Sequence, residues 1–474
     1  MSENNPGRYI VAFEIGSSKV RGAVGVVDNA GVVDVIAVEE EKIIDKVRYG
    51  CIQNIDISNS LRLVIERLEA YPAIEPREIT GVYVALGGRS LSSSMVDTSI
   101  SLSEETEITM PLIQDLVAKA RASIGADRDV VEVVPVRFTV DNKLQNNPVG
   151  TFGTQIGARM MVLSCAQQIK RMLRRVINDR LALDINGYIP RPLAEAEIVL
   201  TDDERRLGCM FVDFGAETTT VAIYRQGYPV YVATLPMGSR NITLDLTSLN
   251  YLEERAEEIK KVSGNALPQD PTRRRQGLDG IDYTEINNYV HARADEIVAN
   301  IIAQLGYAGM KDSELPGGIV IVGGGARLRG FNELLANQSK LKVRQGAVSA
   351  NVRITDGSIH GSEMIDVISV ISAAAEMPDV PCMTELPEDT YQDHRPESYE
   401  DFEPESEGEG VSRIGSLDDE PDRATKEDKD RVKKEKEKRK ENEDDNSADS
   451  RSSILESLRH RISNMFNDNS EFIQ

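Results

Sequence analysis

Two short segments of this chain place a carboxylate, a glycine and hydroxyl side chains together at the end of an apolar run. The first contains Glu14, Gly16, Ser17 and Ser18, and the second contains Asp213, Gly215, Ala216, Thr218 and Thr219. Because glycine lacks a Cβ, such a turn lets backbone N–H groups come close to a phosphate chain. The pair predicts two half-sites that face one phosphorylated ligand.

The charged residues beside these turns suit the rest of a polyphosphate. Magnesium keeps most of its water shell and needs few protein ligands, so Glu14 and Asp213 are expected to hold Mg²⁺ through water. Lys19 is expected to neutralise a terminal phosphate. A single Gly-Ser-Ser turn is more often an ordinary hairpin, and no side chain stands out as a general base for an attacking water. No catalytic residue is therefore predicted.

A third segment favours a nucleotide as the ligand. An apolar strand expected at 318–322 runs directly into three consecutive glycines, Gly323, Gly324 and Gly325. Bare backbone of this kind allows a flat purine to lie against it. Two phosphate turns and one purine loop together favour nucleotide binding over three unrelated turns.

The apolar periodicity around these segments predicts a duplicated, mixed α/β fold. Three-stranded meanders are expected at 9–13, 20–27 and 32–38 and again at 209–214, 218–224 and 229–235. Ser58 is expected to cap a helix over 58–70, which a strand at 82–86 follows. Further helical segments are predicted at 241–262, 284–305 and 363–376.

Length, charge and cysteines limit the class of protein. A chain of 474 residues is too long for one hydrophobic core. More than half of its net charge of -23 lies in 381–450, and the remainder has no broad basic surface, so nucleic acid is not an expected partner. The four cysteines include no CxxC pair, which favours a reducing cytoplasm. No signal peptide or run of about eighteen apolar residues occurs, so we expect no membrane span.

The C-terminal part of the chain changes composition twice. Residues 379–450 are rich in Glu, Asp, Lys, Pro and Ser, which predicts a flexible acidic linker. The segment 451–474 then places apolar side chains on one helical face with arginines beside them: Ile454, Leu455, Leu458, Arg459, Arg461, Ile462, Met465 and Phe466. This pattern predicts an amphipathic helix in the interface of an anionic membrane. Docking on a protein groove is the alternative, but a docked helix needs no long linker.

The order of motifs over residues 9–376 resembles the actin, Hsp70 and sugar-kinase superfamily, in which ATP lies between two duplicated domains. Four strings are similar to the FtsA family in particular: GSSKV at 16–20, NPVG at 147–150, TDDERRLG at 201–208 and AEEIKKVSG at 256–264. The segment 83–163 also resembles a subdomain that this family inserts. The resemblance implies an actin-like, ribonuclease H-like duplicated fold with a nucleotide cleft.

The resemblance implies further contacts with ATP. Glu257 and Lys260 would reach the ribose or adenine, Gly238 would back the phosphates, and Arg327 would stack on the adenine. The alternative for Glu257 and Lys260 is a solvated ion pair one helical turn apart.

Both phosphate turns depart from the family pattern. Glu14 stands where relatives usually have aspartate, and the usual Gly-Gly-Gly-Thr-Thr-Asp run reads Gly-Ala-Glu-Thr-Thr-Thr at 215–220. Ala216 limits the approach of backbone, and Glu217 adds a negative charge beside a polyphosphate. We therefore expect ATP binding with slow hydrolysis at most.

The resemblance also implies how the chain is divided. The expected parts are a first domain at 1–82 and 164–200 with the inserted subdomain at 83–163, a second domain at 201–244 and 312–362 with its subdomain at 245–311, a return helix at 363–378, the linker at 379–450 and the membrane helix at 451–474.

The function that the resemblance implies is structural rather than enzymatic. An ATP-binding actin homologue would polymerise and anchor FtsZ to the cytoplasmic face of the inner membrane at the division site. The FtsZ C-terminal tail is expected to dock within 245–311, where arginines 273–275 form either a docking site or an exposed loop. Other division proteins are further expected partners. The alternatives are an Hsp70-like or kinase-type ATPase and the actin-like assembly protein of type IV pilus machines.

Overall fold

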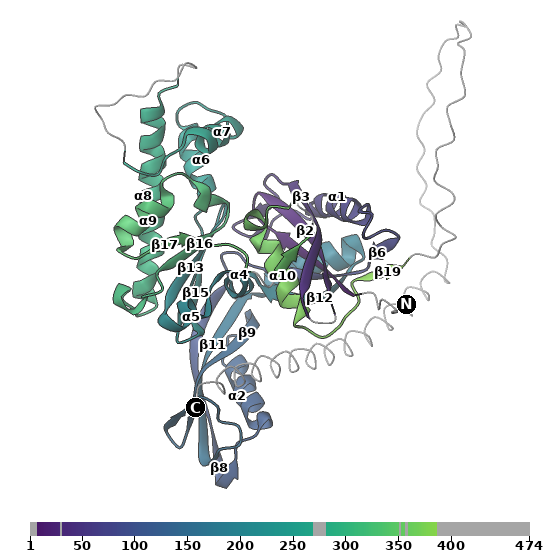
Figure 1. Ribbon diagram of the computed structural model, residues 1–474, viewed down its shortest axis with the longest axis vertical. Helices are drawn as coiled ribbons and strands as arrows, with labels where there is room; N and C mark the ends of the chain where they lie inside the picture. The colour runs from purple at the N-terminus through teal and green to yellow at the C-terminus, as the bar shows by residue number, and fades with distance from the viewer. Residues whose placement is uncertain (1–6, 29–30, 269–280, 350–351, 356–358, 386–474) are drawn as a thin grey trace, which may run out of the picture. The chain divides into compact units, whose positions relative to one another are not determined.

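The computed structural model describes residues 7–28, 31–268, 281–349, 352–355 and 359–385. These residues belong to one compact unit with two lobes and an inserted domain (Figure 1). The expected linker beyond residue 385, the membrane helix and the arginines at 273–275 lie outside the described residues. Among the helices of the described ranges, none is long and apolar enough to cross a membrane.

The first lobe is built on a six-stranded sheet with the order β12-β7-β1-β2-β3-β18. Its strands are β1 (Arg8–Ile15), β2 (Lys19–Val27), β3 (Val33–Lys42), β7 (Gly81–Leu86), β12 (Asp184–Pro190) and β18 (Val352–Ile354). The antiparallel meander of β1, β2 and β3 is confirmed, and β7 and β12 extend the sheet in parallel from β1. Consequently β1 and β7 end side by side, at the same edge of the sheet.

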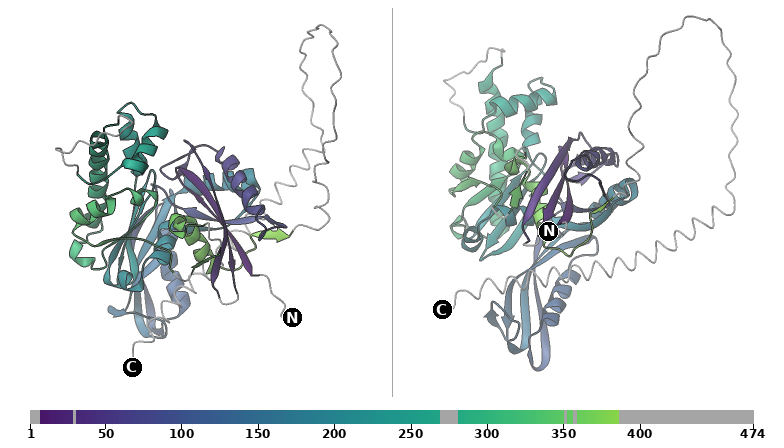
Figure 2. Two further views of the ribbon diagram at one scale, coloured as in Figure 1. Left: turned by 45° about the horizontal axis from the view of Figure 1, so that its top comes forward. Right: turned by 45° about the vertical axis from the view of Figure 1, so that its right-hand side comes forward.

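Helices cover the sheet of the first lobe. They are α1 (Ile57–Glu69), α3 (Gln167–Arg174) with a π-helical turn at Arg175–Arg180, α4 (Arg191–Val199) and α10 (Ile365–Ala375). Although α10 comes late in the chain, it packs on β1 and α4, and Figures 1 and 2 show it in green beside the purple first strands. The central strands β1 and β2 are buried along most of their length, as in a sheet covered on both faces.

The second lobe repeats the topology of the first. Its strands are β13 (Cys209–Phe214), β14 (Thr219–Arg225), β15 (Tyr228–Leu235), β16 (Ile319–Val322) and β17 (Val343–Gln345). Their order, β15-β14-β13-β16-β17, matches β3-β2-β1-β7-β12 of the first lobe, with the same antiparallel and parallel pairings. The duplication that the repeated motifs predict is therefore present in the sheet topology.

The two helical segments expected in the second lobe are present, one of them interrupted, and two further helices occur. The helices are α5 (Asp202–Leu207), α6 (Ser239–Thr247), α7 (Glu253–Ser263), α8 (Tyr283–Tyr307) and α9 (Phe331–Ser339). The helical segment expected at 241–262 is divided into α6 and α7. Thr201 caps α5 through a reciprocal capping box with Glu204, and Asp282 caps α8.

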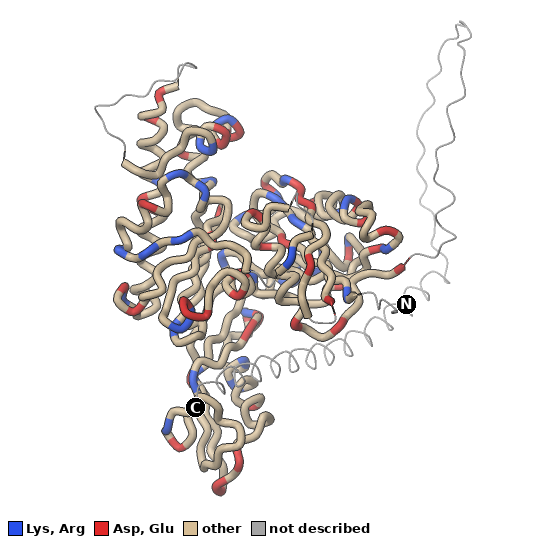
Figure 3. Tube along the Cα trace, viewed as in Figure 1, with Lys and Arg blue, Asp and Glu red and all other residues tan. Residues whose placement is uncertain are grey.

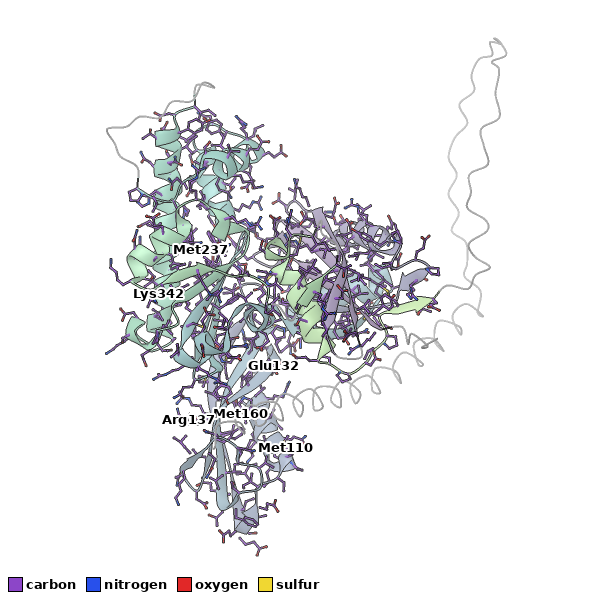
Figure 4. All side chains as sticks on the ribbon, viewed as in Figure 1. Met110, Glu132, Arg137, Met160, Met237 and Lys342 are labelled. Atoms are coloured by element: carbon purple, nitrogen blue, oxygen red, sulfur yellow. The ribbon has the colours of Figure 1, made fainter. Side chains whose placement is uncertain are left out.

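The inserted domain consists of β8 (Ser92–Glu107), α2 (Met110–Ala122), β9 (Arg128–Val140), β10 (Lys143–Gln145) and β11 (Phe152–Ala166). Figure 4 labels Glu132, Arg137 and Met160 on its strands and Met110 at the start of α2. Strand β8 pairs with β15 where Ser92 faces Ala233, so the insert continues the sheet of the second lobe. The expected boundary at Tyr83 falls inside β7.

Two local predictions are wrong. Ser58 does not cap α1, because Asp56 holds the cap position and Ser58 is buried inside the first turn. The linker does not begin at residue 379, because β19 (Met383–Glu385) pairs with β6 (Arg77–Ile79) and the side chain of Cys382 is buried beside them. A second short pair joins β4 (Val47–Arg48) and β5 (Cys51–Ile52).

Candidate functional site

A cleft of about 1050 Å³ lies where the two hairpin turns meet. Its volume is that of a site for a cofactor-sized ligand. The predicted residues that line it are Glu14, Gly16, Ser17, Ser18, Lys19, Asp213, Gly215, Ala216, Thr218, Glu257, Lys260, Gly323, Gly324, Gly325 and Arg327. Residues from both lobes and from widely separated parts of the chain thus share one cavity, as the motifs predict.

The two turns are closed by the same backbone hydrogen bond. Gly16 N donates to Lys19 O at 3.0 Å, and Gly215 N donates to Thr218 O at 2.9 Å. The first turn also binds the Gly50 backbone, whose N–H donates to Ser17 Oγ at 3.1 Å. The two turns therefore have the same local geometry, which suits both of them to the same kind of ligand group.

Two predicted residues, Thr219 and Gly238, are not among the residues that line the cleft. Thr219 is fully buried, and its Oγ1 donates to Met237 O at 2.8 Å; Figure 4 labels Met237 in the second lobe. Gly238 lies directly behind the second turn, where a Cβ would approach Ala216 O to 2.4 Å. Both residues therefore support the turn from behind.

Replacement of Gly238 by alanine is expected to destabilise the second turn. The new Cβ meets backbone that a side-chain rotation cannot move, so we expect a loss of about 1–3 kcal/mol in the free energy of unfolding. Thermal unfolding followed by circular dichroism measures the effect. Gly306→Ala is the matched control, because a Cβ there meets nothing within 4 Å. Equal melting temperatures for the two variants would contradict the prediction.

The side chain of Glu217 does not face the cleft. Its carboxylate accepts from Arg240 Nη1 at 2.7 Å and from the Tyr49 backbone N–H at 2.7 Å. Arg240 also binds Asp45 of the first lobe at 3.2 Å. The negative charge expected to repel a polyphosphate is therefore paired with a guanidinium, and the same contacts connect the two lobes.

The expected cations of the site are all bound to carboxylates. Lys19 Nζ donates to Glu40 at 2.6 Å, and Arg327 Nη1 donates to Glu363 at 2.5 Å. The ion pair considered for Glu257 and Lys260 forms at 2.7 Å, and both residues also line the cleft. An ion pair between Glu257 and Lys260 is therefore compatible with a place for both residues beside a bound nucleotide.

A cluster of buried charges that no sequence motif indicated also lines the cleft. Arg191, in the first turn of α4, donates from Nη1 to Glu14 Oε1 at 2.7 Å and from Nη2 to Asp213 Oδ2 at 2.5 Å. Its Nε also lies 3.5 Å from Glu195 Oε1, one turn further along α4. These residues all line the cleft.

The second cation of the cluster is Arg21. Its guanidinium forms an ion pair with Asp366 and another with Glu40, the latter at 3.1 Å. Both Arg21 and Asp366 line the cleft. Arg21 and Asp366 come from β2 and α10, so elements from both ends of the chain supply the cluster.

These residues fit a nucleotide but not a magnesium ion between Glu14 and Asp213. The glycine turns and the loop at 323–325 leave backbone exposed to the cavity, as phosphate and purine binding require. In contrast, the guanidinium of Arg191 already binds both carboxylates. A divalent cation placed between them would be repelled by that guanidinium. The predicted magnesium position thus conflicts with the geometry.

Burial controls the acidity of the cluster. Burial, together with the neighbouring Asp366, raises the pKa of Glu14 to about 7 against the opposing effect of Arg191 and Arg21. Burial likewise raises the pKa of Asp213, against the opposing effect of Arg191, and raises that of Glu195 well above its usual value. Burial therefore favours the protonated form of these carboxyl groups, whereas the arginines favour the charged form.

Glu14→Gln is expected to flatten the dependence of stability on pH. The folded state of the parent protein binds the Glu14 proton up to about pH 7, whereas the unfolded chain releases it near 4.5. Stability should therefore fall as pH rises between these values, and the variant should lose part of that slope. Melting temperatures at a series of pH values measure this slope. The control is Glu66→Gln, which changes an exposed glutamate on α1. An unchanged slope would contradict the assignment.

A weak signal for Arg191 was present in the sequence. Arg191 and Glu195 lie four residues apart in PRPLAEAE, which reads as an ordinary ion pair on a helix. A cation in the first turn of a helix is unfavourable for the helix dipole, and that placement points to acidic partners elsewhere. Only the parallel pairing of β12 with β7, and of β7 with β1, shows which acids these are.

Comparison with known proteins identifies the family. The model of cell division protein FtsA matches residues 210–369, and the model of the SHS2 domain inserted in FtsA matches residues 88–164. The chain is 29% identical over 357 residues to the cell division protein FtsA of Porphyromonas gingivalis, covering 72% of this chain and 74% of that protein. It is 25% identical to FtsA of Escherichia coli K12, covering 74% and 86%.

The fold is also found in a solved structure. A chain of the PilM-PilN type IV pilus biogenesis complex matches with a TM-score of 0.55 and 15% identity, covering 76% of this chain and 97% of that chain. This likeness concerns the fold alone, which is actin-like with an FtsA-type insert. On its two family-model matches and the relatives that agree with them, the chain belongs to the FtsA family of actin-like cell division proteins.

Proposed function

We propose that this protein is a nucleotide-binding membrane adaptor of the division machinery. It binds ATP, polymerises at the inner face of the cytoplasmic membrane and holds FtsZ filaments there. The observation that carries the proposal is the cleft in which two equivalent glycine turns from the duplicated lobes line one cavity. This arrangement suits a ligand with a phosphate chain.

In the proposed complex the two turns bind the phosphates through backbone N–H groups. Ser17, Ser18 and Thr218 supply hydroxyls, and Gly323, Gly324 and Gly325 allow the purine to approach. Glu257, Lys260 and Arg327 lie at the same cavity and would contact the ribose and base. Because Glu217 is paired with Arg240, it does not weaken phosphate binding as its sequence position suggests.

Membrane attachment is proposed from the sequence of residues 451–474. Their apolar face would insert below the headgroups, with Arg459 and Arg461 beside anionic lipid. One short helix binds lipid weakly, so polymerisation would strengthen attachment by presenting many copies. Self-assembly and membrane binding therefore support each other in this proposal.

The FtsZ tail is proposed to bind the subdomain at 245–311, which contains α7 and α8. In the described part of this subdomain, Leu252 and Val262 are 80% and 74% exposed. Helix α7, which follows Leu252 and contains Val262, carries charged residues of both signs, as the tube in Figure 3 shows for this part of the second lobe. Such a surface offers both apolar and ionic contacts to a peptide.

Reconstitution on lipid tests the proposed function. Liposomes that contain anionic lipid are mixed with the full chain, ATP and FtsZ filaments, and then sedimented. We expect FtsZ to pellet with the liposomes only when the chain is present, and the amount to rise with ATP. Failure of the chain to bind either FtsZ or ATP would refute the adaptor. Rapid ATP turnover without lipid or FtsZ would instead favour an Hsp70-like or kinase-type ATPase.

A further inference from the structure

The position of Arg191 departs from what a nucleotide cleft with a magnesium ion requires. Its guanidinium connects the acid of the first lobe, Glu14, to the acid of the second lobe, Asp213. These two carboxylates come just before the two phosphate turns. A cation that neutralises both acids and faces a bound phosphate chain would have to occupy this place. In this chain an arginine side chain occupies it.

The local structure is built around the guanidinium. The Arg191 side chain is 12% exposed, and those of Glu14 and Asp213 are 4% and 7% exposed. A Cβ at Gly87 would lie 3.5 Å from Arg191 Cζ, so the bare backbone of that loop passes close to the guanidinium. A cation at the start of α4 opposes the helix dipole, and the three acids offset this cost.

Arg191 retains hydrogen-bond donors for a ligand. A guanidinium has five N–H donors in a planar fork that suits carboxylates and phosphates. Two of them are used by Glu14 and Asp213. The buried Nε of Arg191 lies against Glu195 Oε1 at 3.5 Å. The second N–H groups of Nη1 and Nη2 remain for a phosphate oxygen at the cleft, which Arg191 lines.

We propose that Arg191 replaces the divalent cation in this cleft, so that the protein binds ATP without Mg²⁺. The inference rests on the proposed nucleotide binding and adds how the phosphate charge is neutralised. The guanidinium keeps its proton at every physiological pH, so this neutralisation is permanent and independent of the magnesium concentration. Glu14 and Asp213 then orient the arginine rather than a hydrated metal.

The test compares ATP binding in excess Mg²⁺ with binding in excess EDTA, by isothermal titration calorimetry on the full chain. We expect the two dissociation constants of the parent protein to agree within about threefold. Arg191→Gln should bind ATP at least about tenfold more weakly in EDTA, because a charge-assisted phosphate contact is lost. Added Mg²⁺ should restore most of that loss, because the released carboxylates can then hold a hydrated ion.

Controls separate this inference from the proposed function. Arg159→Gln removes an exposed arginine of the insert and should match the parent protein in both buffers. ATP binding by the parent protein that requires Mg²⁺ would overturn the role of Arg191 and leave nucleotide binding intact. No ATP binding in either buffer would refute the nucleotide-binding part of the function itself. An equal loss for Arg191→Gln in both buffers would also overturn the inference.

A second measurement remains informative if Arg191→Gln folds poorly. Mn²⁺ is added to the nucleotide-free parent protein and to Arg191→Lys, and free Mn²⁺ is followed by electron paramagnetic resonance. Lysine keeps the charge but cannot bind both carboxylates with one planar fork. We expect no Mn²⁺ binding to the parent protein and measurable binding to the variant. Binding of Mn²⁺ by the parent protein at the cleft would overturn the proposal.

Discussion

Replacement of Arg191 by leucine should lower the free energy of unfolding by roughly 3–5 kcal/mol, because it leaves buried carboxylates without their cation. Glu14, Glu195 and Asp213 all face the guanidinium and are nearly inaccessible to solvent. Thermal and denaturant unfolding of the full chain measure the loss. No other substitution considered for this protein is expected to destabilise it as much.

Two measurements test whether unpaired carboxylates cause that loss of stability: its dependence on pH, and the loss for a matched control variant. The deficit of the variant should shrink as pH falls from about 7, because burial raises the pKa of Glu14 to about 7 and the carboxylate then takes up a proton. Arg255→Leu removes an arginine from an exposed pair with Glu258 and should cost less than about 1 kcal/mol. Equal losses for the two arginine variants would refute a structural role for the buried cluster.

Ile462→Asp should abolish sedimentation of the chain with anionic liposomes. The substitution places a charge in the middle of the expected apolar face, which must enter the lipid interface. A chain that ends at Ser450 should behave in the same way. Co-sedimentation at fixed lipid concentration measures the bound fraction, with the parent protein as reference.

Asn464→Asp is the control for that experiment. It introduces the same charge two residues later, where the helical period places the side chain on the polar face. We expect only a modest decrease in binding, from repulsion by anionic lipid. Equal loss for Ile462→Asp and Asn464→Asp would show that charge alone matters, and unchanged binding of the chain that ends at Ser450 would exclude the terminal helix as the anchor.

The expected strands and turns of the two meanders could be read from sequence because the signals are local. Strand β13 occupies the predicted residues 209–214, and the two turns after Glu14 and Asp213 form as expected. Apolar runs specify buried strands, and a glycine before hydroxyl residues specifies a tight turn. The repeat of this pattern at both lobes predicted the duplication. The exact ends of the helices, such as the start of α1 after Asp56, could not be predicted from these local signals.

The direction of charged side chains could not be read from sequence. Glu217 was expected to face a polyphosphate, but Arg240 and the Tyr49 backbone turn it to a contact between the lobes. Lys19 was expected to be available for phosphate, but Glu40 binds it. Each partner is remote in sequence, and Coulomb attraction between groups depends on their distance in space rather than along the chain.

The duplicated α/β architecture, the two glycine turns and the triple-glycine loop could be derived from the sequence alone. These depend on side-chain periodicity and on residues without a Cβ, and both properties belong to short segments. In contrast, only the folded chain shows that Arg191 lies between Glu14 and Asp213, which are 177 and 22 positions away in the sequence. That placement follows from the parallel order of β12, β7 and β1 and from the junction of the two lobes, which no local pattern encodes.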